Sequence, residues 1–138
     1  MKELRYGISV EVPLSFQDAI AMAREALKEE GFGILTEIDV KKTLKEKVGA
    51  EFQPYVILGA CNPALAFTAL QDDVDVGLLL PCNVTVREED GKSIVSVMDP
   101  QVMSRLSDAP GLAEVARIAR QKLERALGQM EERAGARA

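Results

Sequence analysis

The chain contains no histidine and no tryptophan, and it has only two cysteines and two asparagines. Without histidine there is no Ser-His or Cys-His pair for nucleophilic catalysis and no imidazole to bind a metal. Two cysteines in 138 residues do not make a disulfide framework, so both are expected to be reduced thiols. An enzyme with conventional acid–base machinery is therefore the least expected class, and the sequence leaves the identity of any cofactor unknown.

Excess basic charge and long apolar runs are also lacking. The formal net charge of -5 argues against binding to nucleic acid or to an anionic membrane surface. The longest apolar run, VGLLLPC, is far shorter than the about 20 residues that span a bilayer. The N-terminal segment lacks the apolar region of a signal peptide. We expect a cytoplasmic protein with neither a nucleic-acid nor a membrane partner.

What is present is the composition of a folded protein, with 47% apolar and 28% charged residues. A chain of this length can bury one continuous core, so residues 1–138 are expected to form a single domain. Its tail, from about residue 131, is expected to fray.

Alternation of polar and apolar residues predicts a strand over residues 4–12, which Pro13 ends. Ser15, with Asp18 three residues later, is typical of a helix start, and Gly31 of a helix end. Residues 32–40 predict a second strand, and residues 41–48 a short helix closed by Gly49.

Residues 54–61 predict a third strand, rich in β-branched and aromatic side chains. A hairpin follows, with strands over residues 76–87 and 93–98 and a turn at Asp90-Gly91. The last element is a long helix with Asp108 as candidate cap and Pro110 near its first turn. One side of it is apolar: Leu112, Val115, Ala116, Ala119, Leu123, Ala126, Leu127 and Met130. The predicted fold class is α+β, a mostly antiparallel sheet covered by helices with a long C-terminal helix.

The two asparagines directly follow the two cysteines, at Cys61-Asn62 and Cys82-Asn83. Asn62 and Pro63 suit the cap and first position of a short helix, which leaves Cys61 just outside its N-terminus. The helix dipole is positive there and favours thiolate, so Cys61 is a candidate nucleophile or soft-metal ligand. The alternative is a small apolar residue that closes the strand, with Asn62 present only as a cap.

Cys82 alternates in phase with Leu80 and Val84, so in an unbroken strand its thiol faces the core and is inert. Pro81 allows a bulge that would re-aim this thiol. The pairing of the strands that carry the two cysteines cannot be read from sequence. Two thiols without an imidazole do not make a closed zinc site, so no metal site is assigned. A dithiol–disulfide switch requires the two α-carbons to lie within about 7 Å.

The motifs Gly59-x-Cys61-Asn62-Pro63 and Leu80-Pro81-Cys82-Asn83 resemble a family known as domain of unknown function 302, found mostly in bacteria and archaea. The resemblance extends from about residue 4 to residue 127. It implies a strand, a helix, a run of antiparallel strands and a final long helix, similar to the TATA-binding-protein or helix-grip class. It implies no established activity. It marks Gly59, Cys61, Asn62, Pro63, Pro81 and Cys82 as family features without assigned roles.

Three functional hypotheses follow. The first is a binding protein for a small ligand, a soft metal or a sulfur species, with Cys61 as the reactive thiol and Cys82, Asn62 and Asn83 beside it. The second is a non-enzymatic homodimeric interaction or structural domain with both cysteines packed in the core, marked by an exposed apolar patch. The third is a carrier of an apolar ligand, marked by a hollow under Leu123 and Leu127.

Overall fold

In the computed structural model, which describes residues 1–137, the strands form one six-stranded sheet in the order β1-β2-β6-β5-β4-β3. Each neighbouring pair is antiparallel. The strands are β1 (Lys2–Glu3), β2 (Gly7–Val12), β3 (Gly33–Asp39), β4 (Tyr55–Cys61), β5 (Cys82–Glu89) and β6 (Lys92–Met98).

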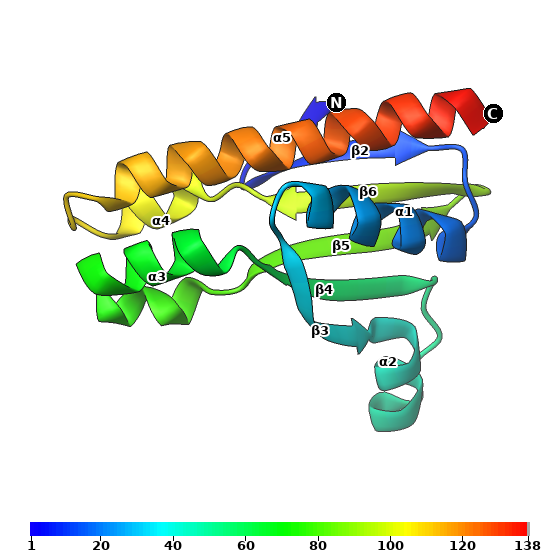
Figure 1. Ribbon diagram of the computed structural model, residues 1–138. Coiled ribbons are helices and arrows are strands. Elements are labelled where there is room, and N and C mark those ends of the chain that lie inside the picture. The colour runs from blue at the N-terminus through cyan, green and yellow to red at the C-terminus, as the bar shows by residue number, and fades with distance from the viewer. Residues whose placement is uncertain (138) are drawn as a thin grey trace.

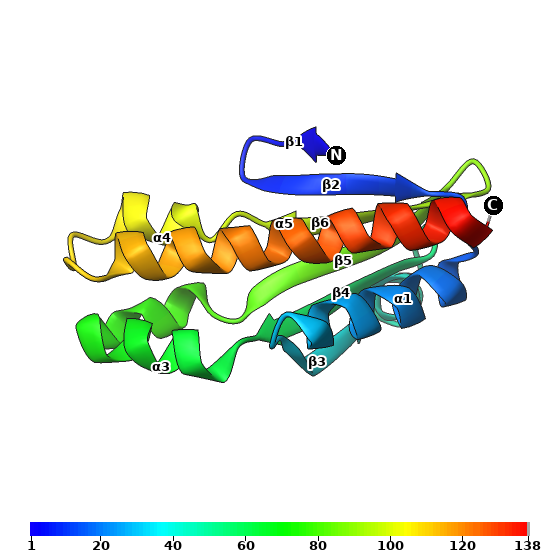
Figure 2. The same cartoon turned by 45° about the horizontal axis from the view of Figure 1, so that its top comes forward.

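The two longest helices, α1 (Phe16–Glu29) and α5 (Leu112–Arg137), lie side by side over one face of the sheet, as Figures 1 and 2 show. The helix α2 (Val40–Val48) projects from the β3 edge, away from α5 (Figure 1). Three short elements gather at one end of the sheet: α3 (Pro63–Asp72), the 3-10 helix η1 (Val74–Leu79) and α4 (Gln101–Leu106). This arrangement confirms the predicted α+β class with a long C-terminal helix.

The core has two parts because the sheet is shorter than α5. Alternate side chains of β2, β4, β5 and β6 pack against α1 and residues 119–134 of α5 to form the main core. Val10, Val86 and Val95, which are register partners, are among them. A second, smaller cluster lies beyond the sheet and consists of Ala69, Val76, Met103, Leu112 and Val115. We call it the end cluster.

Most local signals acted as predicted. The Ser15 hydroxyl accepts a hydrogen bond from the Asp18 N–H at 3.2 Å and so caps α1. Gly31 and Gly49 follow the ends of α1 and α2 with φ of 85° and 66°, a conformation that glycine adopts without strain. Asp90 and Gly91 form the β5–β6 turn, as expected.

The N-terminal strand starts later than its alternation predicted. Lys2–Glu3 folds back as β1 and pairs with β2, and the Leu4 N–H donates to the Gly7 carbonyl at 2.7 Å to close this turn. As a result Tyr6, in the turn, is 68% exposed instead of buried. Alternation alone did not reveal the reversal.

The predicted strand over residues 32–40 lies at the sheet edge and is largely exposed. A register irregularity between Ile34 and Thr36 separates the two ends of β3, so Ile34 packs toward the main core while Ile38 is exposed. Val40 is not in the strand. It begins α2, because the Asp39 carboxylate accepts the Lys42 N–H at 3.0 Å and caps the helix.

The first strand of the predicted hairpin is shorter than expected. Residues 74–79 form η1, capped by Asp73, and β5 begins only at Cys82. Leu78, which has the same phase as Leu80 and Cys82 in the predicted strand and was therefore expected to face the core, is 89% exposed. Residues 101–106 form α4, a helix that the sequence did not reveal.

The last helix starts and ends later than predicted. It begins at Leu112, after a turn at residues 110–111, so Asp108 lies too far away to cap it. It continues through Arg137, past the point where fraying was expected, and Ala134 is buried in the main core. Of the expected frayed tail, Ala138 lies outside the described residues.

Candidate thiol site

Sheet register brings the two cysteines to the same end of neighbouring strands. Ala60 of β4 is the partner of Cys82 on β5, so Cys61 follows one residue beyond that pair. On its other side Cys61 pairs with Gly33 of β3. The strands that carry the two cysteines, whose pairing could not be read from the sequence, are therefore direct neighbours in the sheet.

Both cysteines line one cavity of about 30 Å³, located where α3, α4 and α5 pack against the end of the sheet. The cavity lies between the main core, which contributes Phe32 and Ala119, and the end cluster, which contributes Val115. Besides Cys61, Cys82 and Asn62, the residues that line the cavity are apolar, and Met103 is one of them. The residues that line this cavity therefore include two cysteines but no charged side chain.

The two thiols differ in burial. Cys82 is 6% exposed, whereas Cys61 is half-buried at the strand end. Burial raises the pKa of the Cys82 thiol to about 11, and the neighbouring Cys61 adds to this shift through like-charge repulsion. Cys82 is therefore a neutral thiol near pH 7, while Cys61 is the thiol that a reagent from solvent reaches first.

Asn62 joins two helices. Its side-chain oxygen accepts the Leu65 N–H at 3.3 Å and caps α3, as predicted, with Pro63 as the first helical residue. Its amide nitrogen donates to the Glu30 carbonyl at the end of α1, at 3.4 Å. Both ends of the side chain are thus used to hold α1 and α3 together beside the cavity.

Asn83 is not part of this site. It is exposed on the face of the sheet opposite α1 and α5, in a shallow groove that Tyr6, Tyr55 and Arg87 also line. The second asparagine therefore does not repeat the role of Asn62, although each follows a cysteine.

Gly59 and Pro81 pack against each other at the same end of the sheet. A Cβ at position 59 would overlap the Thr36 hydroxyl and lie 2.9 Å from the Pro81 ring. Glycine is required there so that β3 and the segment before β5 can approach β4. Pro81, which follows a cis peptide bond, also lines the cavity, whereas Gly59 and Pro63 do not.

Met103 is the cavity residue that sequence reasoning missed. It lies on α4, is 3% exposed, and belongs to the end cluster. No local signal marks it, because α4 was not predicted and its position depends on how it packs against α5. It is the third sulfur-containing residue that lines the cavity.

Two further observations bear on function. Among residues 1–137, no group of three or more His, Cys, Asp or Glu side chains is placed to hold a metal ion. In the described part of the chain, no helix combines the length and the apolar character needed to cross a membrane.

Comparison with known proteins gives a family and a fold. The family described as "Domain of unknown function DUF302" matches residues 8–130. A crystal structure of an uncharacterized conserved DUF302 protein from Bacillus stearothermophilus is 32% identical in sequence, with a TM-score of 0.84. The match covers 92% of this chain and 99% of that one. No curated protein matches the chain.

Proposed function

The chain belongs to the DUF302 family, and we propose that it is a binding protein that holds a small, soft species, a metal ion or a sulfur species, at Cys61 and Cys82. The observation that carries the proposal is the shared cavity: two thiols on neighbouring strands line one small apolar space. The half-buried Cys61 is the entry thiol, and the buried Cys82 is its partner.

The size of the cavity favours a small guest over an organic one. A volume of about 30 Å³ exceeds the about 10–15 Å³ needed for one water, but drug-sized ligands occupy pockets of about 300–1,000 Å³. Leu123 and Leu127, under which a carrier's hollow was expected, are both fully buried and belong to the main core. These observations favour the thiol hypothesis over the carrier hypothesis.

The proposal requires both cysteines to be reduced before the guest arrives. Thiols persist in the cytoplasm and are oxidised in secretory and extracellular compartments. The proposal therefore includes a cytoplasmic location and a small-molecule or metal partner.

The test is native mass spectrometry of protein purified without reductant or chelator. The expected result is an added mass on the wild-type chain that a chelator or a reductant removes. Cys61→Ala and Cys82→Ala should lack it. Asn83→Ala is the matched control, because Asn83 directly follows Cys82 in the chain but lies on the opposite face of the sheet. This variant should retain the added mass. A wild-type chain with two free thiols and no added mass contradicts the proposal.

A second candidate is a homodimeric interaction domain, which exposed apolar side chains at the α3 end of the molecule favour. Phe67, Val74 and Leu78 all extend into solvent there. This hypothesis also required both cysteines to be packed, and Cys61 is only half-buried. Light scattering tests it: wild type should be a dimer and Leu78→Asp a monomer, and a monomeric wild type contradicts it.

A further inference from the structure

We infer that the cavity is a Cu(I) site in which Cys61, Cys82 and Met103 are the three sulfur ligands. The inference rests on the proposed function and identifies the bound species as a Cu(I) ion. Three separate elements supply the sulfurs: the end of β4, the start of β5, and α4. The β4–β5 register brings the two cysteine residues to this end of the sheet, and the packing of α4 against α5 adds Met103 to the same cavity lining.

Methionine often fills irregular space in a core, so burial alone does not make Met103 a ligand. Its surroundings separate it from the other buried methionines. Met22 and Met130 are about equally buried, but both belong to the main core. Met103 instead lines the cavity that contains both thiols of the chain.

The ligand set selects the metal. Thiolate and thioether sulfurs are soft donors that favour Cu(I), whereas calcium, magnesium and manganese prefer oxygen. Structural zinc sites take four protein ligands, and within residues 1–137 no group of three or more His, Cys, Asp or Glu side chains is placed to provide them. Cu(I) is stable with two or three sulfur ligands, which is what the cavity offers. The mostly apolar walls also limit contact with water, in which free Cu⁺ disproportionates to Cu²⁺ and copper metal.

Binding is a ligand exchange whose atoms and charges balance. One Cu⁺ replaces the two thiol protons: two S–H bonds break, two Cu–S bonds form, and both protons leave to solvent. The Met103 sulfur donates a lone pair and loses nothing. Copper remains Cu(I) throughout, so the step needs no oxidant or reductant. The bound unit carries one net negative charge, and the N-terminus of α3, which starts directly after Asn62, presents the positive end of its dipole beside Cys61.

The experiment is an anaerobic titration of the metal-free protein with Cu(I) in competition with a chromophoric Cu(I) chelator. Wild type should bind one Cu(I) per chain. Cys61→Ala and Cys82→Ala should each lose at least about 100-fold in affinity, since even residues that only support metal ligands change it by about 10–100-fold. Met103→Leu, which conserves side-chain volume, should lose about 10-fold. Met22→Leu is the matched control and should bind as wild type does.

X-ray absorption at the copper edge gives a second readout. Wild type should show three sulfur neighbours and Met103→Leu two. Circular dichroism verifies that each variant is folded; if Cys82→Ala does not fold, Cys61→Ala, at the more exposed thiol, decides the result.

Three outcomes overturn the inference. The first is a wild type that binds Cu(I) no more tightly than Cys61→Ala does, and the second is displacement of copper by zinc at equal concentration. Unchanged affinity and sulfur count in Met103→Leu would remove Met103 from the site. If Cu(I) binding fails while native mass spectrometry still finds a thiol-dependent adduct, only the identity of the guest is wrong. If neither is found, the proposed function also fails.

Discussion

At the scale of the residue, Cys82 ties protein stability to pH. Its pKa is raised to about 11 in the folded protein from an ordinary value of 9.0, mainly by burial. The unfolded chain therefore ionises at this thiol first as pH rises. The stability that the neutral, buried thiol contributes is fully present below pH 9.0 and is lost as pH approaches about 11.

We predict that the unfolding free energy of wild type falls by about 2–3 kcal/mol more than that of Cys82→Ala over this interval, at about 1.4 kcal/mol per pKa unit. Urea denaturation of both proteins at a series of alkaline pH values measures the difference. Parallel pH profiles for the two proteins would show that the thiol is not shifted in the folded state.

Asn62 and Asn83 are the same residue type in similar sequence contexts, but only Asn62 makes structural hydrogen bonds to two helices. We predict that Asn62→Ala lowers the unfolding free energy by about 1–2 kcal/mol, the usual cost of a lost helix cap. Asn83→Ala, on the exposed face, should change it by less than about 0.5 kcal/mol.

Asn62→Asp adds a second comparison. It keeps the oxygen that caps α3 but removes the N–H donated to Glu30, so its stability should lie between those of wild type and Asn62→Ala. Denaturant titration of the three variants is the measurement. Equal losses for Asn62→Ala and Asn83→Ala would contradict the assigned role.

At the scale of the element, the close packing of β3 and the segment before β5 on β4 depends on Gly59. A methyl group there would overlap Thr36 and crowd Pro81, so the strands must separate. We predict that Gly59→Ala destabilises the protein by about 1–3 kcal/mol, the usual cost of overpacking. Adding Thr36→Ala should recover part of the loss, because it removes the nearer of the two obstacles.

Gly33→Ala is the matched control for this substitution. Gly33 lies on the neighbouring strand, its φ is not positive, and the space around its Cβ position is open. This change should be neutral or slightly stabilising. Thermal unfolding of the three variants tests the set, and a Gly59→Ala protein as stable as wild type would show that the strands are not in close contact.

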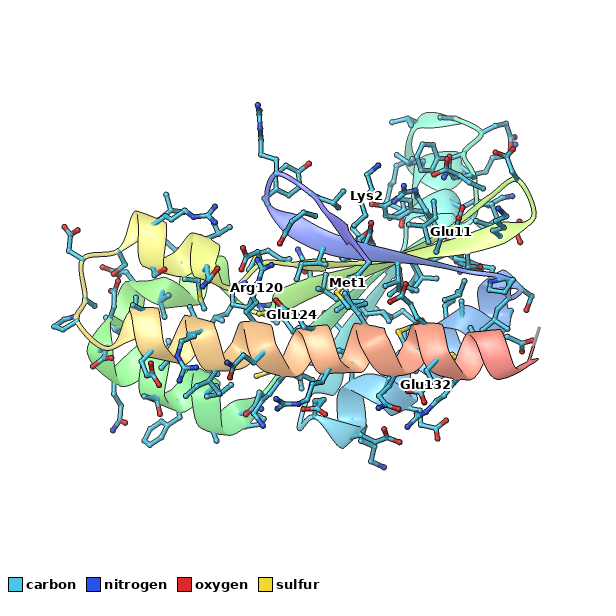
Figure 3. The ribbon with its side chains drawn as sticks, turned by 90° about the horizontal axis from the view of Figure 1, so that it is seen from above. Met1, Lys2, Glu11, Arg120, Glu124 and Glu132 are labelled. Carbon is cyan, nitrogen blue, oxygen red and sulfur yellow. The ribbon has the colours of Figure 1, made fainter. Side chains whose placement is uncertain are left out.

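At the scale of the whole molecule, Arg120 connects parts of the chain that are far apart in sequence. Its guanidinium contacts Asp99 and Glu124, each at 2.7 Å, and also Glu3 of β1. Figure 3 shows Arg120 and Glu124 on the side of α5 that faces the N-terminal strands. Asp99 is only 4% exposed, and besides this contact its carboxylate accepts the Gln101 N–H at 2.9 Å and lies 3.6 Å from Arg105.

We predict that Arg120→Ala destabilises the protein by about 2–4 kcal/mol, because it leaves the buried carboxylate of Asp99 with only the Gln101 N–H and the more distant Arg105 as partners. Arg117→Ala on the same helix is the control. Arg117 pairs with Glu114 on the surface, where solvent screens the charges and such a pair contributes little to stability. Denaturant unfolding compares the two, and losses of equal size would contradict a structural role for the Arg120 contacts.

Much of the fold could be predicted from sequence because its signals are local. A cap such as Ser15 acts on an N–H three residues away, and Gly31 or Gly49 acts where the chain must reverse. The apolar side of the last helix repeats with the period of the helix itself, and every residue predicted on it is buried. Where two local patterns competed, prediction failed: alternation favoured a strand over residues 76–80, but Asp73 caps a 3-10 helix there.

The candidate site was only half predictable, for a physical reason. Two thiols, the lack of an imidazole, and an asparagine able to start a helix after Cys61 can be read directly from the amino-acid sequence. Folding is what makes β4 and β5 neighbours in a register that places Ala60 opposite Cys82. It also decided that α4 brings Met103 to the same cavity and that Asn83 faces the other way. Register and helix packing depend on contacts between residues far apart in the chain, and no local pattern encodes them.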